Sequence, residues 1–66
     1  MQVTVNGEAR ALNFGATVRE LLADLSLEPV RVAVEVNEDL VPRRSFDRAE
    51  LRDGDRVEIV TFVGGG

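Results

Sequence analysis

The chain has 66 residues, which is enough for one domain, and it is acidic, with a net charge of -4 and a pI near 4.6. It contains no Cys, His or Lys, and all eight basic residues are Arg. These absences exclude a Cys/His zinc site, a disulfide framework, a nucleophile–His dyad and a lysine Schiff base. The acidic balance argues against a nucleic-acid partner. No stretch resembles a signal peptide or a membrane span, so we expect a cytoplasmic protein without a membrane partner.

The first residues predict a β-hairpin. Met1 to Asn6 alternate between apolar and polar side chains, as in a half-buried strand. Asn6-Gly7 is the dipeptide typical of a tight hairpin turn, because both central residues of that turn need a positive φ. We expect the second strand to run from Ala9 to Phe14 and to end at Gly15.

A helix is predicted next. Thr17-Val18-Arg19-Glu20 fits a capping box, in which the Thr and Glu side chains each bond the backbone of the other residue. Val18, Leu21, Leu22 and Leu25 then form one apolar stripe at helical spacing. Pro29 indicates that the helix and its exit turn have ended.

The second half of the chain predicts further strands. Val30 to Val36 alternate as a long, central strand, and Leu40-Val41 suggest a short edge strand. The loop that follows is polar apart from Phe46, which we expect to anchor it. A turn at Asp53-Gly54 precedes a final strand from Arg56 to Val63.

This order of elements predicts an α+β fold of the β-grasp (ubiquitin-like) type. It has a mixed sheet of four to five strands with one helix packed across one face, and the first and last strands pair in parallel in the middle. Residues 1–63 would form the single domain, and residues 64–66 a flexible C-terminal glycine tail.

The tail Gly64-Gly65-Gly66 can be interpreted in two ways. A glycine run can simply be a frayed end, because it packs nothing. Its position directly after a strand favours a functional arm. Three extended residues reach about 10 Å, at about 3.3–3.6 Å each. Without Cβ atoms such an arm could enter a narrow channel and present the carboxylate of Gly66.

A second candidate site is the outer face of the last strand, where alternation places Val60 and Phe62. Two neighbouring apolar residues on an open face suggest a docking patch for a partner. Alternatively, the loop from Pro42 to Glu50 folds back and covers them. The acidic residues lack metal-ligand spacing and are expected to form a solvated surface.

The whole chain resembles the ThiS family of sulfur carriers in thiamine-thiazole biosynthesis. One departure is the third glycine, since the family needs only a terminal Gly-Gly, which Gly65-Gly66 supply. The segments that carry the resemblance are Asn6-Gly7-Glu8, Thr17-Val18-Arg19-Glu20-Leu21-Leu22, Val32-Ala33-Val34-Glu35-Val36-Asn37, Val41-Pro42-Arg43, Asp53-Gly54-Asp55-Arg56-Val57-Glu58-Ile59-Val60 and the C-terminal glycines.

The resemblance implies a cycle at Gly66. A ThiF-type, E1-like adenylyltransferase uses ATP and Mg²⁺ to make an acyl-adenylate, while the carrier itself binds no cofactor or metal. A sulfur donor such as a cysteine desulfurase then supplies the sulfur of a thiocarboxylate, which a ThiG-type thiazole synthase consumes. The chain would thus be a protein co-substrate and not an enzyme. Several alternatives stay open. They are a MoaD-like carrier for molybdopterin synthesis, a carrier for cysteine or another sulfur metabolite, a protein modifier of the ubiquitin type, and a non-catalytic β-grasp interaction module.

Overall fold

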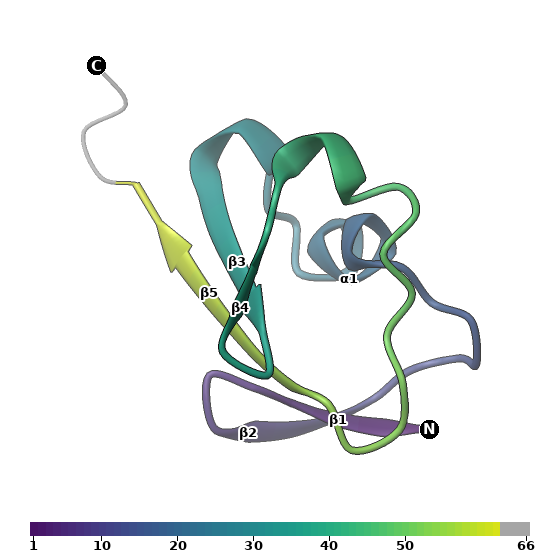
Figure 1. The fold of residues 1–66 in the computed structure, drawn as a ribbon. Helices are drawn as coiled ribbons and strands as arrows, with labels where there is room; N and C mark the ends of the chain where they lie inside the picture. The colour runs from purple at the N-terminus through teal and green to yellow at the C-terminus, as the bar shows by residue number, and fades with distance from the viewer. Residues whose placement is uncertain (63–66) are drawn as a thin grey trace.

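The computed structural model describes residues 1–62, and it places one helix on one face of a five-stranded sheet (Figure 1). The expected β-grasp architecture is therefore confirmed. The predicted glycine tail, residues 64–66, lies outside the described residues, as does Val63. The elements are β1 (Gln2–Val5), β2 (Glu8–Ala11), α1 (Val18–Asp24), β3 (Val32–Val36), β4 (Asp39–Val41) and β5 (Arg56–Thr61), with 3₁₀ turns at Pro29–Arg31 and Arg43–Ser45.

Strand β5 lies at the centre of the sheet, whose order is β2-β1-β5-β3-β4. It pairs in parallel with β1, with Val5 opposite Val57, and antiparallel with β3, with Val34 opposite Ile59. The predicted parallel pairing of the first and last strands is confirmed. The third strand, which was expected to be central, is an interior strand, because β3 lies between β5 and the edge strand β4.

Helix α1 begins as the sequence predicts. The Thr17 hydroxyl accepts a hydrogen bond from the Glu20 amide at 3.2 Å, and the Glu20 carboxylate accepts one from the Thr17 amide at 2.9 Å. Leu21 and Leu22 are fully buried against the sheet. The core has ten buried members: Val3, Val18, Leu21, Leu22, Val32, Val34, Phe46, Leu51, Val57 and Ile59.

Three predicted strands are shorter than expected, and one of them is β5, which ends at Thr61 and leaves Phe62 outside the strand. Strand β2 ends at Ala11, and Phe14, which was expected in it, is 83% exposed. The chain turns here to reach the helix cap, with the Ala16 amide donating to the Asn13 carbonyl at 3.1 Å. Strand β3 begins at Val32, because the preceding residues form a 3₁₀ turn that starts at Pro29, so Val30 is exposed.

The loop from Pro42 to Glu50 lies on the helix side of the sheet (Figure 1). Phe46 is 2% exposed and packs in the core, which confirms that it anchors this loop. The carbonyls of Phe46 and Ala49 accept hydrogen bonds from the amides of Arg19 and Val18, at 3.0 and 2.9 Å. The loop therefore covers the start of α1 and leaves the opposite face of the sheet uncovered.

Candidate functional site

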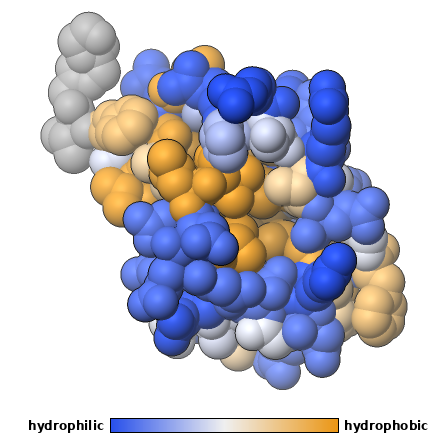
Figure 2. All heavy atoms as spheres, in the orientation of Figure 1, coloured by the Kyte–Doolittle hydropathy of each residue, from blue (hydrophilic) through white to orange (hydrophobic). Residues whose placement is uncertain are grey.

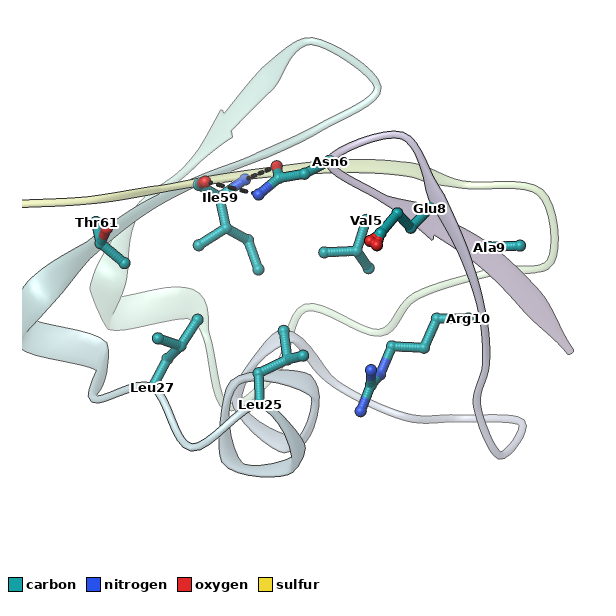
Figure 3. Close-up of a pocket in the computed structure, with 9 residues that line it drawn as sticks. All are labelled: Val5, Asn6, Glu8, Ala9, Arg10, Leu25, Leu27, Ile59 and Thr61. Atoms are coloured by element: carbon teal, nitrogen blue, oxygen red, sulfur yellow. Dashed lines mark hydrogen bonds between the residues drawn. The ribbon is translucent and has the colours of Figure 1, made fainter.

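The candidate site is built on β5, because this strand carries Val60 and leads to Phe62 and the C-terminal glycines. Its position is fixed by asparagines in the turns of both hairpins. Asn6 Oδ1 accepts from the Ile59 amide at 2.8 Å, and its Nδ2 donates to the Ile59 carbonyl at 3.1 Å (Figure 3). Asn37 Oδ1 accepts from the Arg56 amide at 3.0 Å.

Each of these asparagines forms part of a turn and also bonds β5 through its side chain. The φ angles of Asn6 and Asn37 are 51° and 52°, values that asparagine tolerates better than most residues. The same side chains then extend the hydrogen bonding of β5 beyond the residues with which the neighbouring strands pair. Sequence analysis identified Asn6 as a turn residue and missed the contacts of both asparagines with β5, because no local pattern marks a side chain that bonds a distant strand.

Val60 and Phe62 are exposed, by 62% and 53% of their surface. The alternative that the loop from Pro42 to Glu50 covers them is wrong, since that loop packs on the other side of the sheet. Val60 lies opposite Ala33 of β3, and Val57 and Ile59 point into the core. The pair is thus accessible to a partner, and its role in docking stays a prediction.

The sheet surface opposite the helix, here called the open face, also holds charged residues. Glu58 lies directly opposite Glu35 on β3, and Glu35 in turn lies opposite the exposed Leu40 on β4. Figure 2 shows hydrophobic residues reaching the surface beside β4 and the end of β5, with hydrophilic residues on both sides. Sequence analysis missed Glu35 and Leu40, because only the strand register brings them next to Glu58. On β3, β4 and β5 the open face comprises Ala33, Glu35, Leu40, Arg56, Glu58 and Val60, and the exposed Phe62 follows directly after β5.

A groove of about 400 Å³ lies on the helix side, between the β1–β2 hairpin and the end of α1 (Figure 3). Leu25 and Leu27 point across it toward Val5 and Ile59. Glu8 and Arg10 from β2 are the charged residues that line it. The polar side chains of Asn6 and Thr61 complete the lining, together with Ala9.

Within residues 1–62 there is no group of three acidic side chains close enough to hold a metal ion. Nor does this part of the chain contain a helix long and apolar enough to cross a membrane. The predicted reactive residue Gly66 and the threading residues Gly64 and Gly65 lie outside the described residues. The structure thus brings together Val60 and Phe62 on the open face and leaves the tail glycines untested.

Residues 3–66 match the ThiS family. The chain belongs to that family. It is 38% identical to the crystal structure of a thiamine biosynthesis protein (ThiS) from Geobacter metallireducens, with a TM-score of 0.84 and full coverage of both chains. It is also 32% identical to the sulfur carrier protein ThiS of Escherichia coli, again over the full length of both.

The ThiS sequence also occurs as part of longer proteins. This chain is 42% identical over its whole length to a thiazole synthase of Paramagnetospirillum magneticum, but it spans only 20% of that protein. The same share holds for a thiazole synthase of Magnetococcus marinus, at 38% identity. A ThiS-like segment is therefore joined to a much larger remainder in both proteins named thiazole synthase.

Proposed function

We propose that this ThiS protein carries sulfur as a thiocarboxylate on Gly66 and donates it to thiazole synthesis. The observation that carries the proposal is the full-length similarity to proteins named sulfur carrier protein ThiS, which extends through the terminal glycines. The described residues support it indirectly. Val60 and Phe62 are exposed at the end of β5, the strand that precedes the C-terminal glycines in the sequence.

The chemistry needs an activating partner. A carboxylate is a poor electrophile until one of its oxygens becomes part of a leaving group. A ThiF-type adenylyltransferase would join the Gly66 carboxylate to AMP, releasing pyrophosphate from ATP, with Mg²⁺ held in the partner and not in this chain. The outer sulfur of a persulfide on the donor, supplied by a cysteine desulfurase, then attacks the acyl carbon and displaces AMP, which leaves with the former carboxylate oxygen. A second thiol attacks the donor sulfur of the resulting acyl disulfide, so that the thiocarboxylate leaves and the donor is oxidised to a disulfide. A ThiG-type thiazole synthase takes the sulfur.

The absence of Cys and Lys suits a protein whose terminal carboxylate is activated as an acyl-adenylate. A cysteine thiol near the tail could capture the acyl group as a thioester, and a lysine amine could capture it as an amide. The chain has neither residue. Val60 and Phe62, the exposed apolar pair next to the tail in sequence, would dock against the partner enzymes and place the carboxylate in their active sites.

Intact-mass measurement tests the proposal. The chain is co-expressed with its adenylyltransferase and sulfur donor, purified, and compared with the chain expressed alone. Exchange of one oxygen for sulfur adds about 16 Da, and the absence of Cys and the single Met leave few other sites for such a change. A fragment spectrum must place the added mass on Gly66. Absence of the added mass with active partners and ATP would refute the proposal.

A further inference from the structure

The open face carries two carboxylates in an unfavourable arrangement. Glu35 and Glu58 are directly opposite in the β3–β5 ladder, so their side chains leave the same face of the sheet. The Cβ atoms of such a pair lie about 4.5–5.5 Å apart, and like charges in this position destabilise a sheet. Both residues are exposed.

In the described part of the chain, no cation forms an ion pair with either carboxylate. The three ion pairs there join Arg19 to Asp47, Arg31 to Glu28, and Arg56 to Glu38. Arg56 is the basic residue closest to Glu58 along β5, and its guanidinium lies 3.8 Å from Glu38. Neither Glu35 nor Glu58 donates or accepts a side-chain hydrogen bond within residues 1–62.

Apolar residues border the two carboxylates on the same face. Val60 follows Glu58 on β5 after one inward-facing residue, and Leu40 lies opposite Glu35 on β4. Their side chains are 62% and 67% exposed. Apolar contacts around a pair of carboxylates would exclude water and strengthen a charged hydrogen bond made there, as in the centre of a protein interface.

From this geometry we propose that the open face binds thiazole synthase through one arginine or lysine of that enzyme, inserted between Glu35 and Glu58 and bordered by Val60 and Leu40. The inference rests on the proposed function, because it assigns a contact to one of its partners. An arginine suits the site best, because its planar guanidinium has five N–H donors and can bond two carboxylates at once.

Thiazole synthase is favoured as the occupant by the longer relatives. In the P. magneticum protein the segment similar to this chain is covalently joined to the remaining four fifths. Covalent linkage gives a high effective concentration, so even a weak interface is occupied. Wherever the two proteins are not joined, the same occupancy depends on an interface that attracts the partner. A net charge of -4 with two uncompensated carboxylates on the docking face would speed association with a basic surface.

The test compares Glu35→Gln, Glu58→Gln and the double variant with the unchanged chain. Equilibrium binding to thiazole synthase from the same organism is measured at low and moderate salt. We expect the double variant to bind about tenfold more weakly and to show a smaller salt dependence. Its melting temperature should rise, because the repulsion in the free protein is removed. Weaker binding by a more stable protein cannot be attributed to misfolding.

Asp24→Asn is the matched control. It also removes one exposed negative charge, but from the last turn of α1 on the opposite side of the sheet. It should raise the melting temperature slightly, since a carboxylate is unfavourable at a helix C-terminus, and leave binding unchanged. Equal losses in Asp24→Asn and Glu58→Gln would mean that net charge alone acts, and would overturn the proposal.

The remaining outcomes are also decisive. Unchanged affinity of the double variant overturns the inference, as does failure of the unchanged chain to bind thiazole synthase. Self-association through this face in sedimentation, abolished by the double variant, would assign the face to a second copy and likewise overturn it. None of these outcomes affects the 16 Da mass shift on Gly66. The proposed function can therefore stand or fall separately.

Discussion

The side chain of Asn6 bonds both backbone groups of Ile59, accepting from its amide at 2.8 Å and donating to its carbonyl at 3.1 Å. Regular pairing between β1 and β5 ends two residues earlier along β5, at Val57. The asparagine amide thus takes the place of a strand residue and holds the part of β5 that leads to Val60 and Phe62.

This relationship predicts the effect of Asn6→Gly. Glycine adopts the positive φ of this turn freely, so the variant removes the two hydrogen bonds without backbone strain. We expect a loss of about 1–3 kcal/mol in the free energy of unfolding, measured by urea denaturation. Gly7→Ala is the complementary control, because it strains the same turn and keeps both bonds. Full stability of Asn6→Gly would contradict the structural role assigned to Asn6.

The buried stripe of α1 predicts the effect of Leu22→Ala. Leu22 is fully buried on the side of α1 that faces the sheet. Truncation of such a residue lowers the free energy of unfolding by about 2–5 kcal/mol. In a 66-residue domain this is a large part of the total stability. Thermal denaturation should show a strongly lowered or absent transition, while Ala23→Ser on the exposed side of the helix should unfold close to the unchanged chain.

The capping box predicts a smaller effect at the helix start. Thr17→Ala removes the hydroxyl that accepts from the Glu20 amide and should cost about 0.5–2 kcal/mol in the free energy of unfolding. Thr17→Ser keeps the hydroxyl and should retain most of that stability. If serine and alanine lower the free energy of unfolding equally in urea titrations, the threonine methyl group and not the hydroxyl cap provides the stability at this position.

The exposed pair on the open face predicts a loss of binding without a loss of folding. Val60→Glu and Phe62→Glu place a charge on a surface that should be apolar in a complex. We expect each to weaken binding to the partner enzymes about tenfold or more, with melting temperatures close to that of the unchanged chain. Phe14→Glu is the matched control, since Phe14 is 83% exposed in the turn before α1 and outside the open face. Equal losses at Phe14 would mean that the open face has no special role.

Addition of one alanine after Gly66 tests the carrier function directly. The extension moves the carboxylate outward and adds a Cβ atom at the end that should thread the partner's channel. A misplacement of 1 Å can lower the rate about a hundredfold, so sulfur loading should fall to a trace in the intact-mass assay. The melting temperature should not change. Normal loading of the extended chain would refute the carrier hypothesis.

Local patterns predicted most of the fold because they depend on neighbouring residues. The Asn6-Gly7 turn, the Thr17 cap and the alternation of β5 each follow from steric or hydrogen-bonding rules that act within a few residues. The errors occurred where tertiary contacts determine the ends of an element. Alternation extended the third strand back to Val30, but Pro29 begins a 3₁₀ turn whose last residue, Arg31, accepts a hydrogen bond from Phe62.

The candidate site was predictable only in part, for the same reason. Alternation along β5 placed Val60 and Phe62 on one side, but whether that side was open depended on the path of a distant loop. The Glu35–Glu58 pair depends on the register between β3 and β5, and a shift of one residue would have placed these side chains on opposite faces. The role assigned to the tail glycines rests on the sequence alone, because these residues lie outside the part of the chain that the structure describes.

The central place of β5 has a consequence for how the protein is made. Strands β1 and β3 do not pair with each other, and only β5, residues 56–61, joins the β1–β2 hairpin to the β3–β4 hairpin in one sheet. A nascent chain that has not yet reached this segment can form the first hairpin and a transient helix, but no continuous sheet. Because this long-range pairing needs residues 56–61, a chain cut short before β5 would lack a continuous sheet for the helix to pack against. Such a chain would expose its apolar residues and be open to proteolysis.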